Sequence, residues 1–273
     1  MTVINTNNAA LKAQLASKIA DRKLTESGQR LSSGKRINGG ADDAAGAAVA
    51  LKLDAQIQGQ KAAIKTASDA VSLLKLQEAG VSQFVNIIQR IRELSVQMAN
   101  GTFSNNDRSL AQLEVDALTT QFGKVASGTK FNNKEILNAS SSTIYQIQSG
   151  ANQDENFTIS VIEGATLSTN VTNDSDVTSQ SNALLTMNSM ITHLNTAEGH
   201  LATIGASINR LYATINNLSA SSVNTEFALG RISDTDFARE SANLAKQQIL
   251  SNSANQMLST ANRSKNLLTA LLE

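Results

Sequence analysis

One stretch decides the fold: MNSMITHLNTAEGHLATIGASINRLYATINNLSASSVNTEFALGRI at residues 187–232. Its apolar residues recur at alternating steps of three and four: Met187, Met190, Leu194, Ala197, Leu201, Ile204, Ile208, Leu211, Ile215 and Leu218. Polar Ser222 and Thr225 take the next two positions, and the pattern resumes at Leu229 and Ile232. This spacing predicts a coiled-coil seam on one helix roughly 65–70 Å long. Because such a helix cannot bury its stripe alone, the rest of the chain is expected to supply partner helices.

The composition favours helix–helix seams of this kind. The 273 residues include no proline to interrupt a helix, and only 3% are aromatic, so the core is expected to be aliphatic. The formal net charge is zero, which gives no sign of a nucleic-acid or anionic-membrane partner. The absence of cysteine excludes disulfides and thiolate metal sites. We expect no membrane insertion and no cleavable signal peptide, because no sufficiently long apolar run is found.

The first expected helix runs from about Ala9 to Gly34, a residue that adopts a left-handed helix cap freely. Its apolar stripe is thin and is interrupted by basic residues: Leu11, Leu15, Ile19, Leu24 and Leu31. Such a helix is marginal in isolation, so it needs a partner helix, which another subunit can supply. The next residues, Asn38, Gly39 and Gly40, predict a flexible joint.

Asp42 and Asp43 predict the start of a second helix, which ends near Met98. It carries two apolar seams, one of Val71, Leu74, Val81, Val85 and Ile88, the other of Phe84, Ile87, Ile91, Leu94 and Met98. Ser104 and Asp107 match an acidic capping box and predict a third helix to about Val125. Its apolar residues on one side are Leu110, Leu113, Ala117, Leu118 and Phe122.

After the third helix the period changes from 3.6 to 2. Apolar and polar residues alternate at 144–148 and 157–161 around a turn at 150–154, which predicts a β-hairpin. Residues 163–182 are mostly polar and predict a surface loop or short extra structure. A final helix is expected after the start signal at 233–236, and its apolar end implies burial in an assembly. The fold class is therefore mainly α, a long helical coiled-coil rod with one β-hairpin.

No catalytic constellation stands out, so we expect neither an enzyme nor a cofactor. His193 and His200 lie on one face of the long helix but lack nearby carboxylates, which favours surface histidines over a metal site. Asp174 and Asp176 suggest calcium, but the glycine and closing glutamate of a calcium loop are missing. The hydroxyl-rich stretches at 140–143 and 168–178 are interpreted as solvated loops, with O-glycosylation as the alternative.

Several short motifs resemble those of bacterial flagellins. They are Ile4–Asn7, Arg30–Asn38, Asp42–Gly46, Gln89–Gln97, Thr129–Asn132, Gln148–Asn152, Arg231–Glu240 and Gln248–Leu250. Together they cover about 1–162 and 182–273. The sequence departs from the family at Gly39 and Gly40, which loosen the joint, and at Glu273, which replaces a basic residue. Asn133 replaces a glycine, but asparagine tolerates positive φ, so that turn is expected to survive.

The resemblance implies a filament subunit for swimming motility. Residues 1–42 and 229–273 would form an inner domain of terminal helices that pair in the filament, and 43–228 an outer helical domain. Residues 163–182 would be a short loop in place of the family's variable outer domains. The subunit would be extracellular, exported unfolded through the flagellar type III channel, with itself, the cap, hook-junction proteins and an export chaperone as partners.

The resemblance leaves one alternative within the same machine, a hook–filament junction protein. That class usually departs from the Gln-Arg-x-Arg-Glu-Leu motif, which is intact at 89–94. An enzyme or adhesin on the same scaffold would need an inserted domain, for which 163–182 is too short. The terminal helices are expected to become ordered only among copies of the chain.

The resemblance also assigns candidate site residues. Arg90, Leu94 and Glu114 match positions that contact the vertebrate innate flagellin receptor, although Leu94 also belongs to a seam and Arg90 can pair with a neighbouring acid. Asn38, Gly39 and Gly40 would form a hinge between inner and outer layers. The expected inter-subunit packing residues are Leu11, Leu15, Ile19, Leu24, Leu31, Ile249, Met257, Leu267, Leu268, Leu271 and Leu272.

Overall fold

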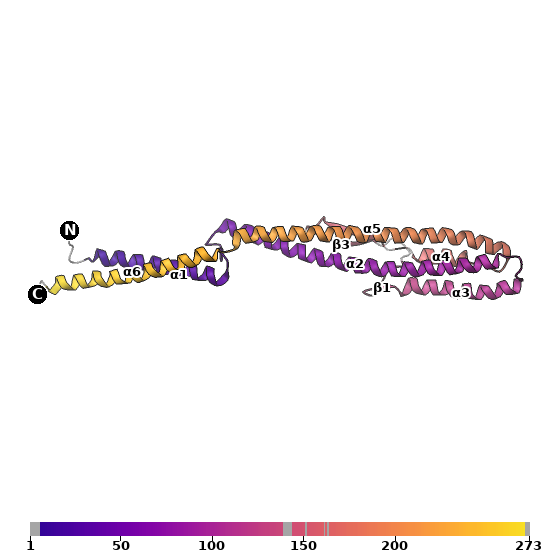
Figure 1. The fold of residues 1–273 in the computed structure, drawn as a ribbon, viewed down its shortest axis with the longest axis horizontal. Helices are drawn as coiled ribbons and strands as arrows, with labels where there is room; N and C mark the ends of the chain where they lie inside the picture. Colours follow the sequence, from indigo (N-terminus) through magenta and orange to yellow (C-terminus); the bar gives the residue numbers. More distant parts are fainter. Residues whose placement is uncertain (1–5, 139–143, 151, 161, 163, 271–273) are drawn as a thin grey trace. The chain divides into compact units, whose positions relative to one another are not determined.

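The computed structural model describes residues 6–138, 144–150, 152–160, 162 and 164–270, with the backbone alone at 144 and 267–270. Within these residues the fold is mainly α, as predicted, and Figure 1 shows the order of its elements. The helices are α1 (Asn8–Ser33), α2 (Ala44–Met98), α3 (Asn105–Gly128), α4 (Gly164–Asn173), α5 (Gln180–Ser233) and α6 (Phe237–Ala270). The strands are β1 (Lys130–Phe131), β2 (Lys134–Glu135), β3 (Ile144–Gln148) and β4 (Asn156–Ser160).

The chain divides into two compact units. The central unit comprises residues 58–222, and the terminal unit comprises residues 1–57 and 223–273. Helices α2 and α5 contribute to both. The predicted inner and outer domains, divided near residues 42 and 229, concern layers of a filament and stay a prediction. No helix in the described part of the chain is both long and apolar enough to cross a lipid bilayer.

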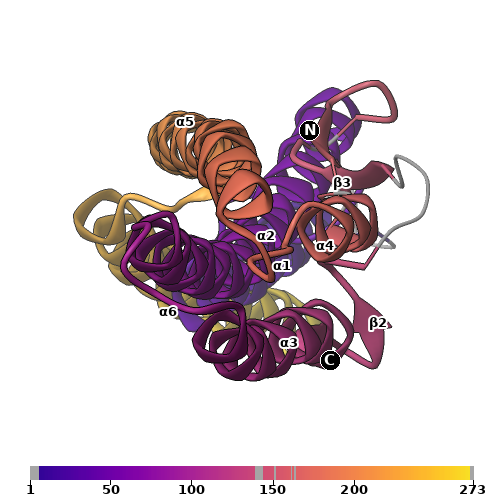
Figure 2. The ribbon, with the colours of Figure 1, turned by 90° about the vertical axis from the view of Figure 1, so that its right-hand side faces the viewer.

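The heptad pattern of α5 forms a core seam of the central unit, as predicted. Met190, Ala197, Ile204 and Leu211 are buried along it. The two predicted seams of α2 belong to the same hydrophobic core, and their most buried members include Phe84, Ile88 and Ile91, together with Val81. A helix buried on two sides packs against several neighbours at once. Figure 2 views these helices end-on, with α3, α4 and the hairpin strands around α2.

Helix α3 packs through a different face from the one predicted. Phe122 is buried and its ring stacks on Phe84 with 4.0 Å between centroids, whereas Leu110 and Leu113 are 62% and 66% exposed. The prediction that these residues share one apolar side is therefore wrong as a description of the buried face, because Phe122 is buried and Leu110 and Leu113 are not. The cause lies partly at the start of the helix, where the buried Arg108 guanidinium donates to the carbonyls of Met98 and Asn100 at 2.8 and 3.0 Å. These bonds satisfy carbonyls at the end of α2 and fix the rotation of α3.

The helix starts follow their predicted caps. Ser104 and Asp107 form a reciprocal capping box at the start of α3. The Asp43 carboxylate accepts from the Gly46 N–H at 2.9 Å, at the start of α2. The Asp236 carboxylate accepts from two N–H groups of the first turn of α6. Short polar side chains stabilise helix starts by satisfying N–H groups that have no intrahelical partner.

Two hairpins follow α3. β1 and β2 are joined by Asn132 and Asn133 at φ values of 49° and 66°, which confirms the expectation that asparagine at 133 can hold positive φ in this turn. β3 and β4 form the predicted antiparallel hairpin, with Ile147 opposite Phe157 and Tyr145 opposite Ile159. Phe157 and Ile159 are buried against the core. Val161, which was expected to extend the second strand, lies outside the described residues.

Residues 164–173 form helix α4, so of the two alternatives predicted for 163–182 the surface loop is wrong there and the short extra structure is confirmed. Leu167 and Val171 are four residues apart and both buried, and Val177 is buried beyond the helix end. The stretch is rich in threonine, serine and asparagine, which have modest helix propensity. Burial of this sparse apolar pair, with α4 lying against α3, supplies what the local sequence lacks.

Candidate functional site

The terminal helices α1 and α6 lie side by side in the terminal unit (Figure 1). Asn7 donates to the Ala261 carbonyl at 3.0 Å, near one end of the pair. Further along, the Ser251 hydroxyl donates to the Asp21 carboxylate at 2.7 Å. Because residue numbers rise on one helix as they fall on the other, the pairing is antiparallel. The partner that α1 was expected to need is therefore present within the same chain.

Most of the fully buried side chains between α1 and α6 are small. The buried residues of the two helices are Ser17, Ala20, Ser27, Glu240, Ser251, Ala254 and Ala261. Leu24 and Leu31, predicted as inter-subunit residues, are partly buried in the terminal unit. The sequence analysis did not predict this seam, because it assigned the packing face of each helix from the large apolar residues. The signal that would have found it is a small residue at every third and fourth position.

Several large apolar side chains of both helices lie outside this seam and are exposed. Leu15 is 60% exposed and Met257 is 68% exposed, and Leu11, Ile19 and Ile249 are exposed as well. For Leu267 and Leu268 only the backbone is described, and Leu271 and Leu272 lie outside the described residues. The single chain thus presents an apolar surface on both terminal helices, which is unusual for a surface in permanent contact with water.

Two short segments connect the end of α1 to the start of α2 and the end of α5 to the start of α6, and hydrogen bonds join these segments to each other. Gly34 ends α1 at φ 69°, the predicted left-handed cap. Its carbonyl accepts from the Thr235 N–H at 2.9 Å, and the Ser233 carbonyl accepts from the Arg36 N–H at 2.6 Å. The Arg36 guanidinium also donates to the Ile232 carbonyl at 2.7 Å. The two connecting segments therefore hold each other in a short antiparallel bridge.

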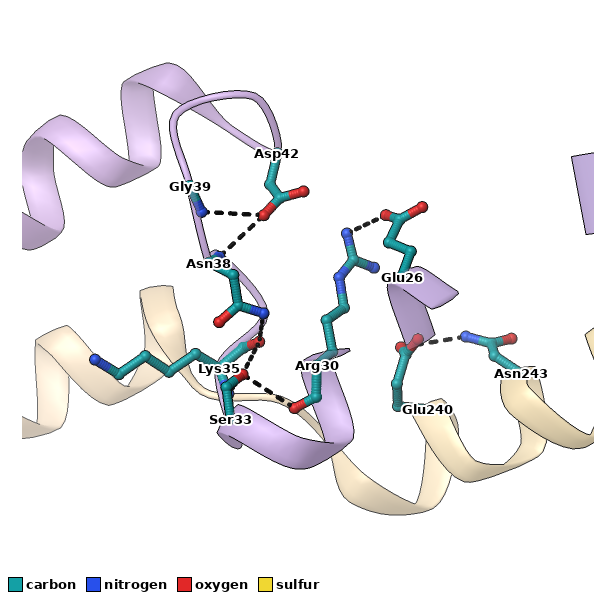
Figure 3. Close-up of polar contacts among 9 residues, drawn as sticks. All are labelled: Glu26, Arg30, Ser33, Lys35, Asn38, Gly39, Asp42, Glu240 and Asn243. Atoms are coloured by element: carbon teal, nitrogen blue, oxygen red, sulfur yellow. Dashed lines mark hydrogen bonds and ion pairs between the residues drawn. The ribbon is translucent and has the colours of Figure 1, made fainter. Parts of the chain in front are cut away.

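The predicted hinge residues lie beside this bridge (Figure 3). The Asp42 carboxylate accepts from the N–H groups of Asn38 and Gly39 at 2.9 and 3.2 Å, and the Asn38 amide donates to the Lys35 carbonyl. Neither Gly39 nor Gly40 has positive φ, and a Cβ at either would meet nothing within 4 Å. These glycines are thus not required by the conformation seen, and the hinge role stays a prediction.

Arg90 and Glu114 form an ion pair on the surface of the central unit. The guanidinium of Arg90 lies 2.7 Å from Glu114 and 3.2 Å from Glu93. The hydrogen bond to Glu114, followed by the one to Glu93, raises the pKa of Arg90 above its ordinary value. Leu94 is only 4% exposed and belongs to the core. A receptor on this surface would therefore reach Arg90 and Glu114, while Leu94 supports the helix beneath them.

His193 is 8% exposed, so the prediction of a surface histidine was wrong for this residue. Its Nε2 lies 2.8 Å from the Asp174 carboxylate, which comes from the segment after α4. Asp176 caps the turn before α5, and hydrogen bonds from the hydroxyl and N–H of Thr178 lower the pKa of Asp176. Among the residues that the structure describes, no three or more metal-ligating side chains gather. His193 and His200 both line a hollow of about 760 Å³ next to β4 and α4.

These features define a class: helical proteins whose terminal helices pair with each other and still expose large apolar side chains. Comparison with known families agrees. Residues 4–142 match the model of the bacterial flagellin N-terminal helical region, and residues 184–272 match that of the bacterial flagellin C-terminal helical region. The chain belongs to the bacterial flagellin family.

Individual relatives span almost the whole chain. A flagellin of Listeria innocua is 31% identical over 286 residues, covering 98% of this chain and 99% of the relative. The flagellar filament 33 kDa core protein of Treponema phagedenis is 31% identical over 287 residues, with 99% of each covered. The crystal structure of Bacillus cereus flagellin shares the fold with a TM-score of 0.50 and 24% identity, over 56% of this chain and 88% of that chain. Nothing in these matches favours a hook–filament junction protein.

Proposed function

We propose that this chain is a structural subunit that self-assembles into a bacterial flagellar filament for swimming motility. One observation carries the proposal. The terminal helices pair through alanine and serine and leave Leu11, Leu15, Ile19, Ile249 and Met257 exposed. Burying one such side chain fully contributes about 1.5–3 kcal/mol, so several per subunit provide a strong driving force for association. A second copy of the same helices, with its own exposed apolar face, is the matching partner.

Assembly of this kind is coupled to ordering of the helices. A seam of small side chains gives α1 and α6 little apolar burial, so the isolated pair is only marginally stable. Neighbouring subunits that bind the paired form shift the equilibrium towards it by mass action. Residues 1–42 and 229–273 would then form the inner layer of the filament, and residues 43–228 the outer layer.

Polymerisation of the purified chain tests this function. Sulfate strengthens the burial of apolar surface, so raising its concentration should convert monomers into long filaments visible by electron microscopy. The result expected is filaments many subunits long that sediment and dissociate on heating. Persistent monomers at all sulfate concentrations, with and without filament fragments as seeds, would contradict the proposal.

The joint between the layers is proposed as a hinge that lets the filament change its helical form. It rests on open space around Gly39 and Gly40, and on a hollow of about 490 Å³ lined partly by Ile37, Ala47 and Leu229. The double substitution Gly39→Ala and Gly40→Ala should leave the monomer folded and restrict the helical forms that filaments adopt as pH and salt change. If filaments of the variant adopt the same helical forms as those of the native chain, Gly39 and Gly40 do not act as a hinge.

Export and the remaining partners follow from family membership alone. We place the filament outside the cell, with subunits leaving unfolded by the flagellar type III route, and with the cap, hook-junction proteins and an export chaperone as partners. Deleting a flagellar export component should retain the chain inside the cell. Unchanged secretion in that strain would contradict this route.

The ion pair of Arg90 and Glu114 is proposed as a contact for the vertebrate innate flagellin receptor. Both side chains are nearly half exposed, so each has capacity for a further charged or polar partner. The substitution Arg90→Ala should reduce receptor signalling by monomers, whereas Arg92→Ala, on a neighbouring exposed position of α2, is the matched control. Equal signalling by the Arg90 variant and the native chain would exclude the contact.

A further inference from the structure

The seam between α1 and α6 contains an unusual set of side chains for two long helices. On α1 the inward positions are Ala10, Ala13, Ser17, Ala20, Leu24, Ser27 and Leu31, and on α6 they are Glu240, Leu244, Gln247, Ser251, Ala254, Leu258 and Ala261. Both sets follow alternating steps of three and four. Eight of these fourteen residues are alanine or serine, which resemble each other in size, so most of the seam changes little when one helix slides by a heptad. The apolar contacts that distinguish one register from another are those of the four leucines.

Two polar contacts cross the seam in the observed register. The Ser17 hydroxyl donates to the Asn255 side-chain oxygen at 3.0 Å, and the Ser251 hydroxyl donates to the Asp21 carboxylate at 2.7 Å. Moving four residues along α1, from Ser17 to Asp21, moves four residues back along α6, from Asn255 to Ser251. The two bonds thus belong to one register and support each other.

The two serines are buried, and their hydroxyls donate across the seam in the observed register. Ser17 is 9% exposed and Ser251 is 6% exposed, so water does not readily replace a lost partner. Elsewhere in the chain helical serines often donate to the carbonyl four residues earlier, as Ser109 and Ser219 do. Ser17 and Ser251 instead donate across the seam, and Ser17 also approaches the Asp21 carboxylate at 3.4 Å. Bonds to a charged acceptor are stronger than neutral ones.

We propose that the bond between Asp21 and Ser251 sets the register of the α1–α6 pair, and that the bond between Ser17 and Asn255 supports it. These are positioning residues. A slide of one heptad in either direction would put Leu244 or Leu258 opposite Asp21 in place of Ser251. Leucine offers no donor, so the exposed Asp21 carboxylate would lose its bond across the seam in either direction and keep only the longer contact with Ser17 of its own helix. Ser17 would face Gln248 or Asn262, each of which has a side-chain oxygen, so the bond between Asp21 and Ser251 is the one that distinguishes the registers. A polar residue at a helix seam can fix register in this way.

Register decides which exposed side chains lie level with one another on the outside of the pair. In the observed register, Leu15 on α1 lies at the level of Met257 on α6. The reason is that Leu15 lies six residues before Asp21, and Met257 lies six residues after Ser251 on the antiparallel helix. A slide of seven residues would displace one helix by about 10 Å and break up this surface. The consequence for assembly rests on the proposed function, whereas the register itself concerns the single chain.

The test measures the register directly in the full chain. The absence of cysteine allows spin labels at Lys18→Cys and Lys246→Cys, two exposed positions displaced along the axis, so that slides in opposite directions give different distances. Distances are measured by pulsed electron resonance in monomers, and in filaments diluted with unlabelled chain. With the native seam we expect one distance. With Asp21→Ala we expect added distances displaced by up to about 10 Å, and with Asp21→Asn, which keeps an acceptor, mostly the native one.

Controls separate register from stability and from assembly. Glu26→Ala removes another acid of α1, one that pairs only with Arg30 in Figure 3, and should leave the single distance unchanged. If Asp21→Ala separates the helices altogether, the exchange Asp21→Ser with Ser251→Asp decides: a restored native distance supports the proposal and a broad distribution overturns it. A single native distance in Asp21→Ala also overturns it. Failure to polymerise would instead bear on the proposed function, and the monomer distances would still report the register.

Discussion

Single residues in this chain are placed by backbone geometry as much as by burial. Asn132 and Asn133 both have positive φ, in the two-residue turn between β1 and β2. Such a turn requires left-handed backbone at both positions, which glycine and asparagine tolerate and other residues resist. Glycine adopts this backbone more readily than asparagine does, so the cost of asparagine at the second position can be measured.

Substituting Asn133 tests this reading of the turn. Asn133→Gly should raise the free energy of unfolding of the central unit by a few tenths of a kcal/mol, and Asn133→Ala should lower it by about 1 kcal/mol. Urea unfolding followed by circular dichroism measures both. Equal stability of the alanine and glycine variants would show that the left-handed backbone is not maintained in solution.

The capping box at Ser104 gives a second residue-scale prediction. The Ser104 hydroxyl, followed by its N–H, donates to Asp107 and lowers the pKa of that carboxyl. A group with a depressed folded pKa stabilises above its unfolded pKa, and that contribution is lost as pH falls through the folded value. The melting temperature should therefore fall below about pH 4, where the unfolded carboxyl also titrates, and part of this fall should disappear in Asp107→Asn. An identical pH profile for the variant would contradict the cap's role.

At the scale of elements, the rotation of α3 decides which residues matter for stability. Phe122→Ala removes a buried ring that stacks on Phe84 and should cost about 3–5 kcal/mol. Leu113→Ala is the matched control on the same helix, and it should cost under about 0.5 kcal/mol because the side chain is exposed. Chemical unfolding of monomers measures the difference. Comparable losses from both would mean that α3 packs through the face carrying Leu113.

The elements differ in how far the sequence predicts them. The heptads of α5 and the two seams of α2 were predictable because large aliphatic residues contrast with polar neighbours along them. Helix α4 was not, since Leu167 and Val171 are the main apolar signal in a stretch of threonine, serine and asparagine. The face of α3 was missed because Arg108 and the Phe84–Phe122 stack fix its rotation through contacts far apart in sequence.

The candidate site shows the same limit more sharply. Sequence reasoning identified the exposed apolar residues of the terminal helices but not the seam between them. Alanine and serine give almost no hydrophobic contrast, so their periodicity in α1 and α6 carries a weak signal. The pairing of Arg90 with a neighbouring acid was anticipated, and the structure identifies that acid as Glu114. The burial of His193 was not anticipated, because it depends on helix α4 and the segment that follows it.

At the scale of the whole molecule, two sets of side chains have different roles in the proposed filament. Alanines, serines and four partly buried leucines pack α1 against α6 within one chain, and the exposed apolar residues on the outside of the same helices are proposed to pack against other chains. Because Leu11, Leu15, Ile19, Ile249 and Met257 lie outside the seam, fold and assembly should be separable by mutation. A substitution outside the seam should spare the subunit and harm the filament.

The most direct test is the critical concentration for polymerisation of the variant Leu15→Gln with Met257→Gln. Its matched control is Lys18→Gln with Lys246→Gln, which alters exposed polar positions on the same helices. We predict that the first pair raises the critical concentration at least about tenfold, because two apolar side chains lose their burial, while the unfolding of the central unit stays unchanged. A critical concentration equal to that of the native chain would contradict the claim that these outward side chains drive assembly.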